Sequence, residues 1–272
     1  MRPSLRTIGV ATVGGLANVA VVLALYVRAD YPTLESTVDT ASLVIPVFAA
    51  GFVPLLVSAH TRLVAPAAVF LTALGGTAYV ELTTPMPEWS ELGGYVVVEG
   101  PTHVASYANA WYVWLSLALV AGLLEFAVRR GYGIAGTPVT NLPAFPLSRI
   151  VLVGTVVGVA GLVGIATTLL VLRAGIRPPI AALVVFAVAA AVTAVPLWAL
   201  LGRGLVSPAV LFAILVPYFL VVEVFVATDS PVHLLLFGPY AVALAIIGAL
   251  EAAIRSRLRG WDGGRFAGEH SR

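Results

Sequence analysis

Charged side chains stand in matching pairs at the ends of long apolar runs in this sequence. Glu81 and Glu223 each come near the end of one such run, and Arg28 and Arg173 each end another. A carboxylate beside apolar surroundings needs a partner, and it is also a candidate for binding a cation, a proton or a polar substrate. The pattern predicts that Glu81 pairs with Arg28 and Glu223 with Arg173, and it makes all four residues candidates for a binding site.

Two histidines extend the candidate chemistry to metals. His103 and His233 each follow a proline by two positions and come just before an apolar run. Imidazole nitrogen and carboxylate oxygen suit zinc or iron, and two histidines facing each other can hold a haem iron. Convergence of both histidines with Glu81 and Glu223 would give a metal site. The alternative is that His103 and His233 only cap the starts of helices.

A further set of charged residues closes two of the apolar runs. Residues 122–129 and 248–255 share five of eight identities, and each segment carries a Glu followed four residues later by an Arg. Glu125 with Arg129, and Glu251 with Arg255, have the favourable order of a helical ion pair. We expect structural ion pairs that fix the depth of two spans at the membrane boundary, where Arg side chains reach lipid phosphates. A gate or a proton relay is the alternative.

The elements that must position these residues are membrane spans. The chain has 272 residues, of which 60% are hydrophobic and 10% charged, and its mean hydropathy is +1.02. Such a composition belongs in a bilayer, which an apolar helix of about 20 residues can cross. We therefore expect an all-α integral membrane protein with eight transmembrane helices. The apolar runs lie near residues 8–27, 41–59, 63–82, 106–128, 150–172, 180–201, 205–227 and 232–254.

The eight runs fall into two sets of four that resemble each other. Arg28 and Arg173 match at an offset of 145 residues, and Glu81 and Glu223 match at an offset of 142. An even number of spans in each set gives both sets the same orientation in the membrane. We expect two parallel four-helix repeats. The expected divisions are a first repeat at 1–130 with an external loop at 83–105, a cytoplasmic linker at 131–149, a second repeat at 150–259 and a cytoplasmic tail at 260–272.

The distribution of arginines predicts the orientation. All 15 basic residues are Arg, and cytoplasmic loops of membrane proteins carry an excess of basic residues. With the N-terminus inside, only Arg28, Arg173 and Arg177 fall outside. We expect a multi-pass protein of a prokaryotic cell membrane with both termini in the cytoplasm.

Missing residue types exclude several function classes. The chain has no Cys, which excludes disulfides, thiolate metal sites and cysteine nucleophiles, and no Lys, which excludes a Walker A motif and a Schiff base. No catalytic triad spacing, nucleotide fingerprint or nucleic-acid module is present. We expect no cofactor, no nucleic-acid partner and a role other than catalysis. The expected partners are the lipid bilayer and either a partner membrane subunit or further copies of the chain.

Two local patterns predict how particular spans pack. One apolar run carries small residues at helical spacing, which lets helix backbones approach closely; these are Gly154, Gly158, Gly161 and Gly164. Another run begins with aromatic residues that are typical of an interfacial belt; these are Tyr107, Trp111, Tyr112 and Trp114.

Repeats, prolines within spans and carboxylates at span ends favour translocation of a small solute or ion at the interface of the two repeats. Two alternatives remain open. The first is an accessory or structural subunit of a membrane complex, and the second is a haem- or metal-dependent membrane enzyme. Translocation requires a polar cavity between the repeats that reaches mid-depth in the membrane.

Overall fold

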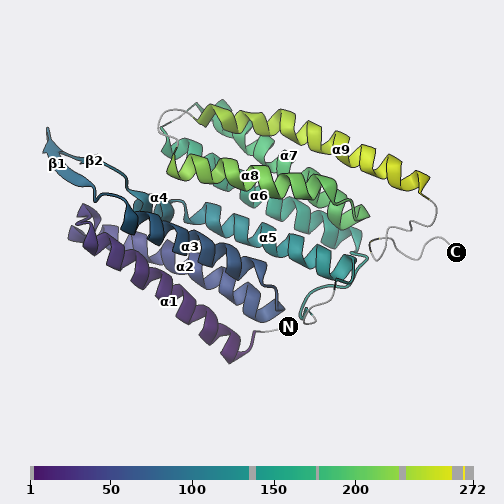
Figure 1. Ribbon diagram of the computed structural model, residues 1–272, viewed down its shortest axis with the longest axis horizontal. Helices are drawn as coiled ribbons and strands as arrows, with labels where there is room; N and C mark the ends of the chain where they lie inside the picture. The colour runs from purple at the N-terminus through teal and green to yellow at the C-terminus, as the bar shows by residue number, and fades with distance from the viewer. Residues whose placement is uncertain (1–2, 135–138, 176–177, 227–230, 259–265, 267–272) are drawn as a thin grey trace.

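The computed structural model describes residues 3–134, 139–175, 178–226, 231–258 and 266. Within these residues eight helices are long and apolar enough to cross a membrane, as the sequence predicts. They run side by side as one bundle (Figure 1). The eight are α1 (Leu5–Arg28), α2 (Thr37–Thr61), α3 (Ala65–Thr83), α5 (Trp111–Gly131), α6 (Arg149–Arg173), α7 (Pro179–Arg203), α8 (Ser207–Phe225) and α9 (Phe237–Arg257).

Local signals explain where these helices begin and end. The Ser4 hydroxyl accepts a hydrogen bond from the Thr7 amide at the start of α1, and Ser148 does the same at the start of α6. Helices α2 and α7 are followed directly by Arg62 and Gly204, which both adopt the left-handed conformation. Such a residue stops a helix because its backbone turns the chain away from the helix axis.

The segment between α3 and α5 contains a hairpin and a short helix. Strands β1 (Glu88–Leu92) and β2 (Tyr95–Glu99) pair in antiparallel fashion. They are joined by Gly93 and Gly94, which both have positive φ angles, as a two-residue hairpin turn requires. The Trp89 indole nitrogen donates a hydrogen bond to the Ala29 carbonyl oxygen at 2.8 Å, which ties the hairpin to the end of α1.

The sequence-based expectation of one continuous span at 106–128 is wrong in its first part. The short helix α4 (His103–Asn109) ends at Ala110, and α5 begins separately at Trp111. The 3₁₀ helix η2 (Pro231–Leu236) precedes α9 in the same way, and a second one, η1 (Pro32–Glu35), follows α1. No proline or glycine marks the break at Ala110, so the hydropathy pattern runs through it.

Residues 3–134 and 139–258, called here the N-terminal and C-terminal halves, share one apolar core. Helix α5 lies between them and packs against α6, α7 and α8 as well as against α2 and α3 (Figure 1). More than half of the α5 span is buried, compared with at most a third of any other span. The described residues therefore form a single bundle with α5 near its centre.

Glycines bring α1 and α2 close together, but the predicted glycine face is not a packing face. A Cβ atom at Gly51 of α2 would lie 2.8 Å from the Gly14 carbonyl oxygen of α1, so only glycine fits there. On α6, Gly164 faces Phe186, whereas the other three predicted packing glycines have no described neighbour where a Cβ would lie. These three are Gly154, Gly158 and Gly161.

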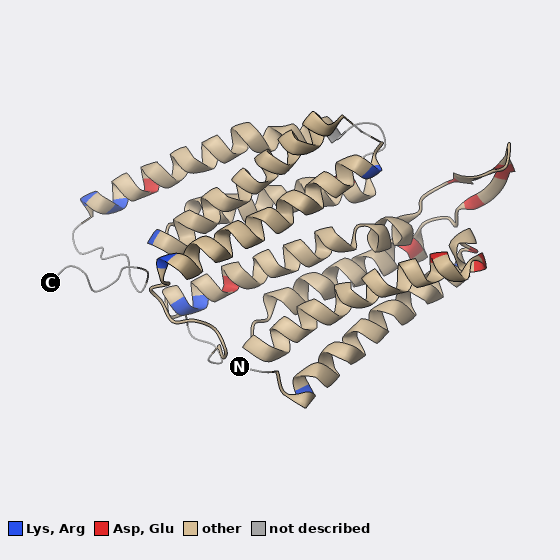
Figure 2. Cartoon of the chain, turned by 180° about the vertical axis from the view of Figure 1, so that it is seen from behind, with Lys and Arg blue, Asp and Glu red and all other residues tan. Residues whose placement is uncertain are grey.

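Charged residues divide the bundle into two ends (Figure 2). Most of the described arginines lie at one end, called here the arginine-rich end, together with the start of α1 and the last turn of α9. The hairpin and most of the described acidic residues lie at the other end, called here the acidic end. The bundle thus has the charge asymmetry that membrane orientation depends on.

Candidate functional site

Glu81, in the last turn of α3, is held by groups of the N-terminal half. Its carboxylate accepts hydrogen bonds from the Tyr31 hydroxyl at 3.3 Å and from the Val104 amide at 2.9 Å. Arg28 donates instead to the main-chain carbonyl oxygen of Glu81 at 3.3 Å, so it does not form the predicted ion pair. Burial and the neighbouring Glu81 raise the pKa of Tyr31, which keeps its proton available for this bond.

Glu223, in the last turn of α8, has a different environment. Its side chain is 5% exposed, and its Oε2 atom lies 3.2 Å from Nε2 of His233. The two atoms do not meet hydrogen-bond geometry, and this carboxylate oxygen has no hydrogen-bond partner among the described residues. A buried carboxylate oxygen without a donor is costly, so Glu223 has unused capacity to accept a hydrogen bond or to bind a cation.

Glu223 lines a cavity of about 350 Å³ at the acidic end, between α4 of the N-terminal half and α6 and α8 of the C-terminal half. Arg173, the last residue of α6, is exposed at this cavity. The remaining polar lining comes from Thr102, Ser106 and Asn109. We call this space the acidic-end cavity. It presents one cationic and one anionic side chain, together with neutral polar groups.

Arg173 also connects the two halves. Its guanidinium group lies close enough to Tyr26 and Tyr112 of the N-terminal half to act on them electrostatically. The Tyr112 hydroxyl is buried and makes no hydrogen bond of normal geometry. The cation at the rim of the cavity is therefore close to the buried Tyr112 hydroxyl and interacts with it.

The two histidines do not complete a metal site. His103 packs against Phe225 with ring centroids 6.1 Å apart, and only His233 is beside a glutamate. No group of three or more His, Asp or Glu side chains in the described part of the chain could hold a metal ion. The proposed metal site consists of His103, His233, Glu81 and Glu223. All four residues lie in the described part of the chain, and the fold does not bring them together.

A buried polar chain in the N-terminal half was not predicted from the sequence. Asn18 donates to the Val47 carbonyl oxygen at 2.7 Å and accepts from the Tyr107 hydroxyl at 3.0 Å. The Trp114 indole nitrogen then donates to the Tyr107 carbonyl oxygen at 3.0 Å. Tyr107 and Trp114 are only 1% and 5% exposed, so the predicted interfacial aromatic belt is wrong for them. The lone Asn within an apolar run was the available signal.

A second polar cavity lies on the other side of α4, beneath the hairpin. It measures about 340 Å³ and shares Thr102, Ala105 and Asn109 with the acidic-end cavity. Tyr31 and Trp89 line it, but both use their polar atoms in the hydrogen bonds described above. Helix α4 therefore separates two polar spaces at the acidic end.

The space between the halves at mid-depth is apolar. A cavity of about 400 Å³ between α3, α5 and α8 has Thr72 as its one polar lining residue. Four buried Thr and Ser hydroxyls elsewhere in the spans donate to carbonyl oxygens of their own helices and are thereby satisfied. These are Thr77, Ser116, Thr167 and Thr193. The described residues thus provide no polar path below the acidic-end cavity.

At the arginine-rich end the predicted i,i+4 pairs form, and each also joins other helices. Arg129 lies 2.7 Å from Glu125, whose other oxygen accepts hydrogen bonds from the two amides at the start of α3. Arg255 lies 2.5 Å from Glu251, whose carboxylate accepts from the two amides at the start of α8. Arg129 and Arg255 further donate to the last carbonyl oxygens of α2 and α7. We call each four-way contact a clamp.

The structure thus brings together Arg173 and Glu223 at one cavity, with His233 beside Glu223. Arg28, Glu81 and His103 do not line that cavity. The chemistry of the acidic-end cavity is therefore the main indication of function. Comparison with protein-family models, with curated proteins and with solved structures found no match to this chain.

Proposed function

We propose that this protein consists of two tandem membrane repeats and that it binds a small zwitterionic solute in the acidic-end cavity. The observation that carries the proposal is the presence of Arg173 and Glu223 in one cavity, with a buried carboxylate oxygen of Glu223 that has no hydrogen-bond partner among the described residues. In the orientation predicted from the arginines, the cavity opens on the outer side of the membrane.

The two clamps support the tandem repeat. Glu125 and Glu251 cap the helices that follow Arg62 and Gly204, and these two left-handed residues lie at the same offset of 142 as Glu81 and Glu223. The four-residue slip between the repeats also has a local explanation. His103 precedes the start of α5 by eight residues and His233 precedes the start of α9 by four, so the extra turn lies in α4.

The charges of the cavity match those of a zwitterion. An ammonium group at Glu223 would supply the donor that the buried oxygen lacks, and a carboxylate at the rim would pair with Arg173 in two parallel hydrogen bonds. Thr102, Ser106 and Asn109 offer hydroxyl and amide groups that fix the orientation of a polar ligand. A cavity of about 350 Å³ has room for a molecule of amino-acid size.

Binding at one face is the activity that the geometry supports best. The translocation favoured by the sequence requires polar groups at mid-depth, and the cavity there is lined by apolar residues apart from Thr72. Transport of the bound solute would need α5 and α8 to separate along this apolar contact. No arrangement of described residues favours the haem or metal enzyme, and none identifies a partner subunit.

The test is calorimetric titration of the purified protein in mild detergent. Glycine and alanine serve as zwitterionic probes, and acetate and methylammonium carry the same charges singly. We expect heat of binding from a zwitterion and none from either single charge at equal concentration. Arg173→Ala and Glu223→Gln should each remove the signal, because each variant leaves one charge of the ligand without a partner.

Thr72→Val is the matched control, since Thr72 lines the apolar cavity and not the acidic-end cavity. It should leave the titration unchanged. Equal binding of acetate and glycine, or full binding by Glu223→Gln, would exclude a zwitterion site. Uptake of a bound probe into proteoliposomes would add translocation to the function.

A further inference from the structure

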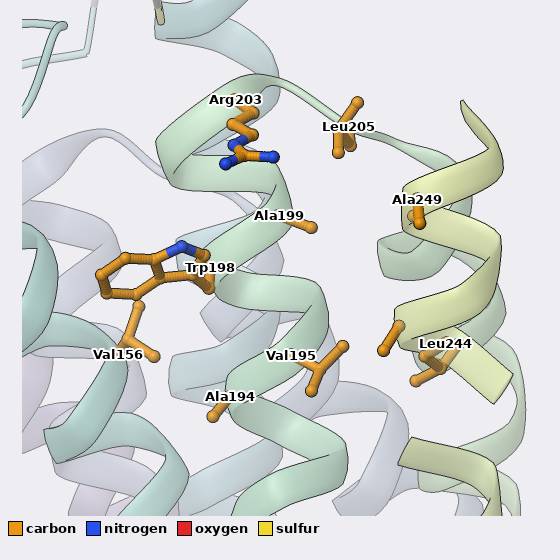
Figure 3. A pocket seen from close by; sticks show the side chains of 11 residues that line it. Val156, Ala194, Val195, Trp198, Ala199, Arg203, Leu205, Leu244 and Ala249 are labelled. Carbon is orange, nitrogen blue, oxygen red and sulfur yellow. The ribbon is translucent and has the colours of Figure 1, made fainter. Parts of the chain in front are cut away.

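A groove of about 410 Å³ crosses the C-terminal half near the arginine-rich end, between α6, α7 and α9 (Figure 3). A smaller cavity of about 250 Å³ occupies the corresponding place in the N-terminal half. Six lining positions correspond at the offsets of the two repeats. They are Val57 and Ala199, Thr61 and Arg203, Leu63 and Leu205, Leu119 and Ala245, Gly122 and Gly248, and Leu123 and Ala249.

The two spaces differ in what covers them. In the N-terminal half, the linker and α6 also line the smaller cavity. They contribute Leu142, Pro143 and Leu147 from the linker and Val151 and Thr155 from α6. In the C-terminal half, the described lining comes only from α6, α7, α9 and Leu205 next to α7. Trp198 of that lining remains 45% exposed. The open groove therefore faces the surroundings of the bundle, which the sequence composition identifies as lipid.

The open groove is lined by smaller side chains than the cavity of the N-terminal half, and it has one additional cation. Ala199, Ala245 and Ala249 replace larger Val or Leu side chains, which widens the groove. Arg203 replaces Thr61 and adds a cation at the arginine-rich end of the groove, where Figure 3 shows it above Trp198. No ion pair of Arg203 occurs within the described residues. The nearby Glu251 is already paired with Arg255 at 2.5 Å.

We propose that this groove binds one anionic phospholipid, with an acyl chain along the apolar lining and the phosphate at Arg203. An apolar channel at span depth that ends, at the membrane boundary, in a cation without an ion pair among the described residues matches the two parts of such a lipid. Trp198 has the amphipathic ring that favours this boundary. The comparison of grooves rests on the tandem repeat proposed above, but it is independent of the solute in the acidic-end cavity.

Charge argues against a second copy of the chain as the occupant. In the N-terminal half the cavity is covered by α6, and Val151 of α6 lies with Thr61 in its lining. The residue of α1 that corresponds to Val151, at an offset of 145, is Arg6. A second copy that covered the open groove with α1 in the same way would place its Arg6 beside Arg203. Two like charges in contact at this boundary repel each other, whereas a phosphate attracts Arg203.

The test measures quenching of Trp198 fluorescence in phosphatidylcholine vesicles. Brominated phosphatidylglycerol and brominated phosphatidylcholine are compared at equal mole fraction, and the signal of Trp198→Phe is subtracted so that only Trp198 is followed. We expect phosphatidylglycerol to associate about fivefold more strongly, the effect of one Arg near the membrane surface. Arg203→Thr, which installs the residue of the other half, should bring the ratio close to one.

Arg257→Thr is the matched control, because Arg257 is exposed at the same end and does not line the groove. It should leave the ratio unchanged. Ala245→Leu with Ala249→Leu fills the groove with the side chains of the other half and should abolish the preference even with Arg203 present. A ratio of one in the wild type, or an equal loss in Arg257→Thr, overturns the proposal. A dimer in native mass spectrometry that the filled-groove variant dissociates would also overturn it in favour of a second copy.

Discussion

The two glutamates in the last turns of α3 and α8 differ in their hydrogen bonds. We therefore expect their replacement by glutamine to affect stability differently. The Glu81 carboxylate uses both oxygens, as acceptors for Tyr31 and for the Val104 amide. A Gln at this position keeps one acceptor and turns an amide group toward a donor. We expect Glu81→Gln to lower the free energy of unfolding by about 1–3 kcal/mol, the cost of an unsatisfied buried donor. Thermal unfolding in detergent, followed by circular dichroism, measures the effect.

Glu223→Gln is the matched variant, because the Oε2 atom of Glu223 has no hydrogen-bond partner among the described residues. It should lower the free energy of unfolding less than Glu81→Gln does, because it loses one 3.2 Å approach to His233 without hydrogen-bond geometry, whereas Glu81→Gln disturbs two hydrogen bonds. An equal loss in both variants would mean that Glu223 is structural. The acidic-end cavity would then lose its main candidate ligand-binding group.

The choice of partners for these residues could not be predicted from the sequence. Arg28 and Glu81 do lie together, but rotation of each helix about its own axis places the guanidinium group at a carbonyl oxygen rather than at the carboxylate. Likewise, Arg173 and Glu223 share a cavity without pairing. The proposed repeat matches these residues by position only, and the identity of the neighbouring helix decides what each one contacts.

The clamps tie the ends of neighbouring helices together within each half. Neither α3 nor α8 has a side-chain cap at its own start, so Glu125 and Glu251 supply the acceptors from the neighbouring helices. We expect Glu125→Ala and Glu251→Ala each to lower the free energy of unfolding by about 1–2 kcal/mol, the usual cost of losing a helix cap. Chemical denaturation in detergent measures this effect.

Glu91→Ala is the control for the clamp variants, since Glu91 is exposed in the hairpin. It should leave stability within about 0.5 kcal/mol of the wild type, as is usual for surface positions. A loss in only one of the two clamp variants would contradict equal roles for the clamps in the two halves.

At the scale of helices, the sequence predicted most of the fold. Six of the eight expected spans differ from the observed helices by a few residues at their ends, because apolar length and charged ends determine where a span lies. The expected fourth and eighth spans begin within the separate short helices α4 and η2. The break between α4 and α5 could not be predicted, because no helix-breaking residue marks Ala110. The predicted packing of Gly154, Gly158 and Gly161 does not occur among the described residues for another reason, since small residues can face lipid as well as protein.

At the scale of the whole molecule, the elements that the proposed repeat matches have different surroundings in the two halves. Helix α5 is enclosed by both halves, whereas its counterpart α9 borders the open groove. Glu81 lies beside Tyr31 within the N-terminal half, whereas Glu223 lies where the halves meet. The open groove therefore lies where the C-terminal half lacks a cover that the N-terminal half has. The acidic-end cavity lies where the two halves join. A pattern within one repeat cannot predict either feature.

The charge asymmetry of the bundle predicts its orientation, and the absence of cysteine makes the prediction directly measurable. Ser90 is exposed in the hairpin at the acidic end, and Ser256 is exposed in the last turn of α9 at the arginine-rich end. Because basic residues remain cytoplasmic, Ser90→Cys should react with a membrane-impermeant maleimide in intact cells. Ser256→Cys should react only after the cells are permeabilised.

Gly75→Cys tests insertion of the bundle in the same experiment. Gly75 lies in the middle of α3, with no described neighbour where a Cβ would be, so a side chain there should face the hydrocarbon. A thiol in hydrocarbon does not ionise, and the thiolate is the form that reacts with maleimide. We expect no labelling of Gly75→Cys before or after permeabilisation, and labelling only in denaturant. Reaction in intact cells would place α3 outside the membrane, whereas an exchange of the Ser90 and Ser256 results would reverse the orientation and move the acidic-end cavity to the cytoplasmic side.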